Sequence, residues 1–94
     1  MSTRETATRL AADLGIPKSR AVEAQMKAKL VAAVVAEVRR RHLTHSQLAS
    51  RSGLGRSTVT GILSGSLQKV SLGRVLRLVE ATGLEAEVRV RRAP

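Results

Sequence analysis

The sequence predicts a mainly α-helical domain of roughly four to five short helices, followed by one β-strand. Three observations lead to this prediction. Apolar residues recur at helical spacing over most of the 94 residues, glycines interrupt the pattern at Gly15, Gly53, Gly65 and Gly83, and the apolar spacing changes to two after Gly83. A chain of this length can bury one small core.

The chain divides into three predicted parts. Residues 1–18 form an N-terminal helical extension, in which a weakly apolar helix covers about residues 3–14. Residues 19–83 form the main helical domain, and residues 84–94 form a C-terminal strand.

The longest predicted helix runs from a cap at Ser19 to about Arg41, and its apolar stripe is the expected floor of the core. The stripe consists of Met26, Leu30, Val31, Val34, Val35 and Val38. A later helix is expected between a cap at Ser71 and Gly83. Its inward residues are expected to be Leu72, Val75, Leu76 and Val79.

Between these two helices, the sequence predicts two shorter ones that meet at a sharp turn. Thr44 and Gln47 have the spacing of a capping box, so a helix of about two turns should begin there. Gly53 suits the left-handed conformation that ends a helix, and Gly55 can start the next. Such a pair is a helix-turn-helix, whose second helix can enter a DNA major groove. The residues that pack this motif are Leu48, Ala49, Gly53, Leu54, Val59 and Ile62.

The charge of the chain points to a polyanionic partner. Its net charge is +10, and the stretch from Arg39 to Val79 contains eight basic residues and no Asp or Glu. A nucleic acid and an anionic membrane are the two candidates. The chain has no Phe, Trp or Tyr, on which binders of single strands stack bases, so double-stranded DNA is favoured.

Several other classes are excluded by the sequence. The longest apolar run, Leu30–Ala36, is too short to span a membrane, and no signal peptide is evident, so we expect a soluble, cytoplasmic protein without membrane partners. The absence of Cys excludes disulfides and thiolate metal sites. His42 and His45 lack further ligands for zinc. The carboxylates are scattered, so we expect no enzymatic activity and no cofactor.

Two segments carry a resemblance to a known family. LTHSQLASRSGLGRSTVTGILSG (residues 43–65) and VSLGRVLRLVEATGL (residues 70–84) resemble the Xre family of Cro- and lambda-repressor-like helix-turn-helix proteins. With the lead-in KLVAAVVAEVRRRH and the terminal strand, residues 25–92 are similar to the subgroup of HigA-type antitoxins. The resemblance implies a lambda-repressor-like helix-turn-helix bundle and makes residues 19–83 a DNA-binding domain.

Carried over by position, the resemblance implies which residues meet DNA. The base-reading candidates on the second helix of the motif are Arg56, Ser57, Thr58, Thr60 and Gly61. Arg56 leads them because a guanidinium can bond both guanine O6 and N7. The phosphate-contacting candidates are His45, Gln47, Arg51, Lys69 and Arg74. Alternatively, Ser57 and Thr58 serve the helix start.

Three further positions have open interpretations. The cations of residues 39–41 could clamp phosphates or complement the dipole at a helix end. Gly61 stands where phage repressors often place a long polar reader, so specificity there could rest on close approach or on DNA shape instead. Val38 and Leu63 stand where those repressors bury an Arg–Glu pair, and an apolar contact avoids the desolvation cost of that pair.

The terminal strand needs a partner edge, since one strand cannot satisfy its own backbone groups. Antiparallel pairing of two copies about Val88 would set Glu87 against Arg89 and Glu85 against Arg91. This predicts a homodimer. The dimer strand comprises Leu84, Glu85, Ala86, Glu87, Val88, Arg89, Val90 and Arg91. The alternative is a strand that pairs with a toxin's sheet or frays.

The expected function is that of a transcriptional repressor. A homodimer would bind an inverted-repeat operator, and by resemblance the chain would be antitoxin and autorepressor of a type II toxin–antitoxin module with an mRNA-interferase-like toxin. The helix at residues 3–14 could then face the toxin or stabilise the dimer. The alternatives are a stand-alone phage or anti-CRISPR-associated repressor, a non-specific architectural DNA-binding protein, and a basic peripheral membrane protein.

Overall fold

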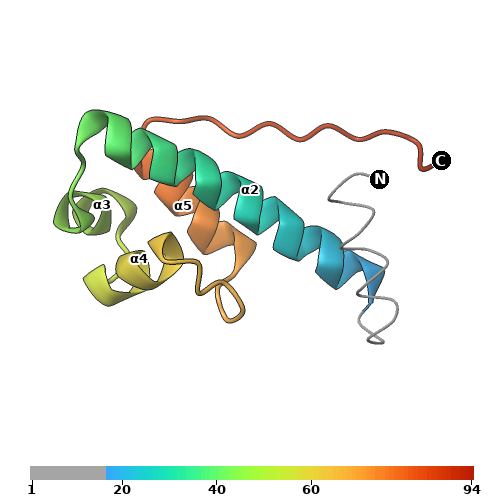
Figure 1. Ribbon diagram of the computed structural model, residues 1–94, viewed down its shortest axis with the longest axis horizontal. Helices are drawn as coiled ribbons and strands as arrows, with labels where there is room; N and C mark the ends of the chain where they lie inside the picture. The colour runs from blue at the N-terminus through green and yellow to red at the C-terminus, as the bar shows by residue number, and fades with distance from the viewer. Residues whose placement is uncertain (1–16) are drawn as a thin grey trace.

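The computed structural model describes residues 17–94, and this part of the chain contains four α-helices. They are α2 (Lys18–Arg41), α3 (His45–Ser52), α4 (Arg56–Leu63) and α5 (Leu72–Ala81). Figure 1 shows α3 and α4 gathered at the C-terminal end of the long α2, while its N-terminal end projects beyond them. The mainly helical prediction is confirmed, and the helix expected at residues 3–14 lies outside the described residues.

The start of α2 differs from the prediction. The helix begins at Lys18 with Pro17 at the N-cap position, so the cap expected at Ser19 is wrong. Pro17 has φ −56°, which its ring fixes, and its missing N–H is not needed where a helix begins.

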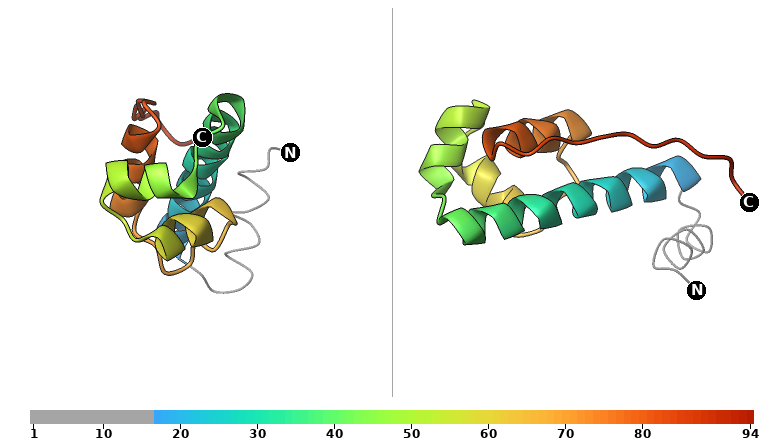
Figure 2. Two further views of the ribbon diagram at one scale, coloured as in Figure 1. Left: turned by 90° about the vertical axis from the view of Figure 1, so that its left-hand side faces the viewer. Right: turned by 90° about the horizontal axis from the view of Figure 1, so that it is seen from above.

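Apolar side chains from all four helices form one core. In Figure 2, α5 lies alongside α2, and α3 and α4 close one end of this pair. The buried apolar residues are Val31, Val34, Leu48, Leu54, Val59, Ile62, Val75, Leu78, Val79 and Ala81. Because no ring fills this space, the fold depends on the close packing of aliphatic side chains.

A buried lysine continues the apolar stripe of α2. Met26 is 47% exposed, whereas Lys27 is only 8% exposed and lies one turn before Val31. The Lys27 ammonium donates to the backbone carbonyls of Leu67 at 3.3 Å and Val70 at 2.8 Å. Lys27 therefore fastens the loop between α4 and α5 to α2, and the stripe expected through Met26 is corrected at that end.

The inward face of α5 is also shifted from the prediction. Ser71 caps the helix as expected, accepting from the backbone N–H of Arg74 at 3.2 Å. Leu78 is fully buried, whereas Leu76 is 37% exposed. The reason is that α5 packs against both α2 and α3, so its buried stripe follows Val75, Leu78 and Val79.

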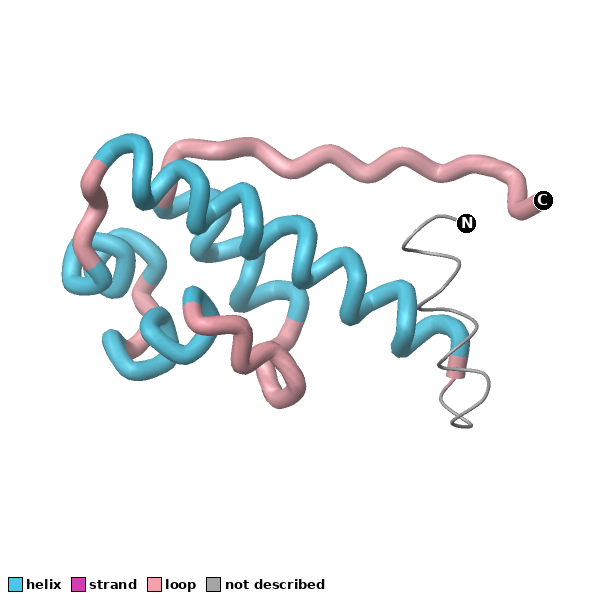
Figure 3. Tube along the Cα trace, viewed as in Figure 1, coloured by secondary structure: helices cyan, strands magenta, loops and turns pink. Residues whose placement is uncertain are grey.

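Residues 84–94 form no strand within the described chain. Figure 3 shows them as an extended loop, and Val88 and Val90 are 86% and 91% exposed. The strand predicted for Leu84, Glu85, Ala86, Glu87, Val88, Arg89, Val90 and Arg91 is therefore absent from the single chain. A strand is defined by a ladder of backbone hydrogen bonds, and here no described segment supplies the other half.

Candidate nucleic-acid interface

The start of α3 is fixed by a capping box, as predicted. The backbone N–H of Gln47 donates to Thr44 Oγ1 at 3.0 Å, and the backbone N–H of Thr44 donates to Gln47 Oε1 at 2.8 Å. Gln47 is exposed, but its amide oxygen is already engaged. Its NH₂ group remains to meet a phosphate.

The turn between α3 and α4 requires glycine for two reasons. Gly53 ends α3 with φ +73°, the left-handed conformation that was predicted. A Cβ added there would lie 2.7 Å from Nη2 of Arg77, whose Nε donates to the Ser52 carbonyl at 2.9 Å. Sequence reasoning found the first reason and missed the second, because Arg77 lies 25 positions beyond Ser52 along the chain.

The two faces of α4 differ in burial. Val59 and Ile62 are fully buried on its inner face, and Leu54 before the helix is buried with them. Among the base-reading candidates of α4, Arg56, Ser57 and Thr60 are exposed, while Thr58 and Gly61 are half-buried. In the remainder of the motif, Leu48 is fully buried, and Ala49 is half-buried.

Ser57 and Thr58 are not engaged at the helix start. Gly55 is the N-cap of α4, and neither hydroxyl makes a side-chain hydrogen bond within the described residues. The alternative interpretation, in which they serve the helix start, is therefore wrong. Their hydroxyls remain available to an external partner.

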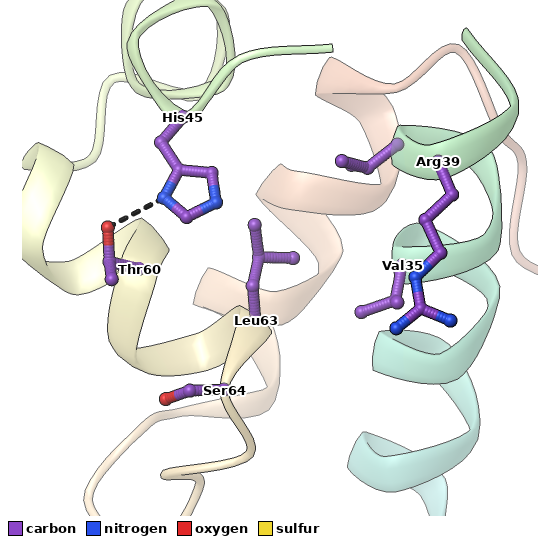
Figure 4. Close-up of a pocket in the computed structure, with 7 residues that line it drawn as sticks. Val35, Arg39, His45, Thr60, Leu63 and Ser64 are labelled. Carbon is purple, nitrogen blue, oxygen red and sulfur yellow. Dashed lines mark hydrogen bonds between the residues drawn. The ribbon is translucent and has the colours of Figure 1, made fainter. Parts of the chain in front are cut away.

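A hydrogen bond joins the base-reading candidate Thr60 to the phosphate-contacting candidate His45. His45, the first residue of α3, lies with its Nδ1 at 2.8 Å from Thr60 Oγ1 of α4 (Figure 4). Both line an open groove of about 290 Å³. The other residues of the groove are Val35, Val38, Arg39, Leu63 and Ser64.

The two positions that correspond to the buried ion pair of phage repressors both line the groove. Val38 and Leu63 are both half-buried and line it from α2 and α4. The apolar replacement is thus present, but it lies at the wall of an open groove. No pattern in the sequence indicated that a space would remain between these helices.

Four basic side chains in the acid-free stretch are used within the protein, and we call them the bound cations. Arg40 makes two hydrogen bonds to the Glu37 carboxylate at 2.8 and 2.9 Å. Arg41 donates to the carbonyl of Thr82 at 2.6 Å, and Arg51 lies 3.5 Å from that of Ala81. The bound cations are Arg40, Arg41, Arg51 and Arg77.

Four others, the free cations, make no side-chain hydrogen bond or ion pair with residues 17–94. They are Arg39, Arg56, Lys69 and Arg74. All four are exposed. Of the phosphate-contacting candidates, Lys69 and Arg74 are therefore unengaged, whereas Arg51 reaches toward the end of α5.

The three arginines at residues 39–41, for which a phosphate clamp and the dipole at a helix end were the two interpretations, are engaged differently. Arg40 bonds to a carboxylate and Arg41 to a carbonyl, while Arg39 lines the groove from α2. The Arg40 hydrogen bonds lower the pKa of the Glu37 carboxyl. This stretch offers an external anion one free guanidinium.

Comparison with known proteins agrees with this geometry. The family model for a helix-turn-helix domain, HTH_37, matches residues 10–91. The chain belongs to this helix-turn-helix family. A solved structure described as an XRE-family transcriptional regulator is similar to it, with 28% identity and a TM-score of 0.66 over 77% of this chain and 81% of that one. No curated protein matches the sequence.

The helix-turn-helix prediction and the XRE-type fold are thereby confirmed. In residues 17–94, no helix has the length and apolar character needed to cross a bilayer.

Proposed function

We propose that this helix-turn-helix protein is a sequence-specific transcriptional repressor that binds double-stranded DNA through α4. One observation carries the proposal: Arg56 and Ser57 are exposed at the start of α4 and have no partner within residues 17–94. Arg56 would bond guanine, and the free cations Lys69 and Arg74 would bond phosphates. The similarity to an XRE-family transcriptional regulator supports the regulatory role.

Competition binding tests this function. A duplex selected from a random library should remain bound under excess random duplex, which an architectural protein or a membrane-surface protein would not achieve. Arg56→Ala should weaken binding to the selected duplex by about 1 to 3 kcal/mol and to random duplex very little. Arg20→Ala removes the same charge at the far end of α2 and should change neither. Equal losses on both duplexes would contradict readout by Arg56.

The proposal includes a homodimer formed through residues 84–92. Leu84 packs against the core, and the rest of the segment is extended and exposed, with two exposed valines and alternating charges, as a strand without a partner edge would be. Two copies paired about Val88 would read half-sites about 34 Å apart in an inverted repeat. Val88→Cys should cross-link two chains on oxidation, and efficient linking only at a distant engineered cysteine would contradict this register.

The proposal also includes an antitoxin role. It rests on the similarity of residues 25–92 to HigA-type antitoxins, in which the same chain represses its own promoter and neutralises an mRNA-interferase-like toxin. An adjacent reading frame for a basic protein of that kind, and its co-purification with this chain, would support the role. A chain that represses alone, without such a neighbour, would instead fit a phage or anti-CRISPR-associated repressor.

A further inference from the structure

The hydroxyl of Thr60 is held by a side chain from the neighbouring helix. Its Oγ1 lies 2.8 Å from His45 Nδ1, although 15 positions separate the two residues. Ser57 and Thr58, the other hydroxyls among the base-reading candidates, have no such bond within the described residues. Thr60 is exposed as a residue, so its side chain can be approached from outside.

The direction of this hydrogen bond decides what Thr60 can offer to a base. A hydroxyl has one hydrogen to donate and two lone pairs to accept with. If Nδ1 carries the ring proton, it donates to Thr60, whose own hydrogen stays free. If a neutral ring carries its proton on Nε2, Nδ1 must accept, and Thr60 uses its single hydrogen on His45, whereas an imidazolium ring would donate from both nitrogens.

A bound phosphate would select the second arrangement. Figure 4 shows the other ring nitrogen of His45 directed away from Thr60, toward the groove that Arg39 also lines. A phosphate accepts hydrogen bonds and does not donate them, so Nε2 must carry the proton in order to bind it. Arg39, a free cation, lines the same groove from α2, next to Val35.

We infer that His45, as a neutral imidazole with its proton on Nε2, makes Thr60 a hydrogen-bond acceptor toward DNA. This inference rests on the proposed function. Thr60 then selects a base whose major-groove edge presents an amino group, cytosine N4 or adenine N6, and rejects guanine O6 and thymine O4, which are acceptors themselves. His45 is a positioning residue in this scheme, because it determines the specificity of a side chain on another helix.

The test is a selection from a randomised duplex library with matched variants. Wild-type protein should prefer adenine or cytosine at one position by about three- to tenfold, the value of one hydrogen bond. Thr60→Val, which keeps the shape and removes the hydroxyl, should abolish the preference at that position alone. His45→Phe, which keeps a ring without nitrogen, should abolish it as well, while the preference due to Arg56 persists.

His45→Asn separates the two roles of the imidazole. Its Oδ1 can accept from Thr60 in place of Nδ1, but its side chain is too short to replace Nε2. We therefore expect the preference for an amino group to survive, with weaker binding to every duplex. Circular dichroism melting checks that each variant folds, and if His45→Phe does not, Thr60→Val and His45→Asn still decide the matter.

Three outcomes would overturn the inference. They are an unchanged preference in Thr60→Val, a preference for guanine or thymine at the position that Thr60→Val alters, and a uniform loss in His45→Phe with every preference retained. A wild-type protein that selects no sequence at all would instead overturn the proposed function. The two failures are therefore distinguishable.

Discussion

The bound and free cations come from the same acid-free stretch of sequence but have different roles. Arg41, Arg51 and Arg77 reach backbone carbonyls at the C-terminal ends of α5 and α3. Such carbonyls lack helical partners and carry partial negative charge, so a guanidinium satisfies and stabilises them. The side chains of the free cations donate to no backbone carbonyl within residues 17–94. Only four of the eight basic residues in this stretch are therefore free to meet a polyanion.

The largest expected effect concerns salt. If a dimer engages six to ten phosphates through its free cations and His45, affinity for DNA should fall by about 10³- to 10⁵-fold between 50 and 200 mM salt. Fluorescence anisotropy over that range gives the slope directly. A flat response would show that the free cations do not meet phosphates.

The next effect concerns stability at the turn. Gly53→Ala should lower the free energy of unfolding by about 1 to 3 kcal/mol, because alanine is strained at φ +73° and its methyl group displaces the Arg77 guanidinium. Urea denaturation measures the loss. Gly73→Ala, inside α5 and with no close neighbour other than Ser71 Oγ at 3.9 Å, is the matched control and should not destabilise.

A bound cation should contribute to folding and not to DNA affinity. Arg77→Met keeps the aliphatic stem and leaves the Ser52 carbonyl without its donor, so unfolding should become easier by about 1 kcal/mol. The salt slope of DNA binding should not change. A lower slope with unchanged stability would place Arg77 among the free cations.

A free cation should behave in the opposite way. Lys69→Ala should weaken binding to selected and random duplexes alike and reduce the salt slope by about 1. Thermal unfolding should stay the same, because the Lys69 side chain has no bond to lose within residues 17–94. A sequence-dependent loss would mean that Lys69 contacts a base.

The smallest effect concerns pH. Since the Arg40 hydrogen bonds lower the pKa of Glu37, this pair stabilises the fold above the usual range of a glutamate carboxyl, and the contribution disappears as acid protonates Glu37. Glu37→Gln should therefore lower the melting temperature slightly at pH 7 and not at pH 3. A difference that persists at pH 3 would assign the loss to packing.

Much of the fold was predictable because its signals are local. The Thr44–Gln47 capping box, the Ser71 cap and the left-handed Gly53 each depend on residues within a few positions of one another. The outward residues of α4 were implied by the family resemblance, and its inward residues Val59 and Ile62 by the helical spacing. These features account for the order of the helices and for the side of α4 that faces outward.

Apart from the cap expected at Ser19, the errors concern contacts between distant parts of the chain. Lys27 belongs to the buried face of α2 because it donates hydrogen bonds to backbone carbonyls 40 and 43 positions away. Arg77 likewise donates to the distant backbone carbonyl of Ser52. The bond between His45 and Thr60 depends on the angle between two helices. The strand predicted for residues 84–94 would need a partner edge, which no other part of residues 17–94 supplies.

Gly61 leaves open the space that a Cβ would occupy on α4. Apart from its chain neighbours and its own helix backbone, no atom lies within 4 Å of the point where its Cβ would be, and glycine inside a helix is less stable than alanine by about 1 kcal/mol. A Cβ could therefore be added without disturbing a neighbour. For a protein that reads DNA, a change in a single codon could create a new target sequence without weakening the fold, which is a simple route by which duplicated copies could diverge.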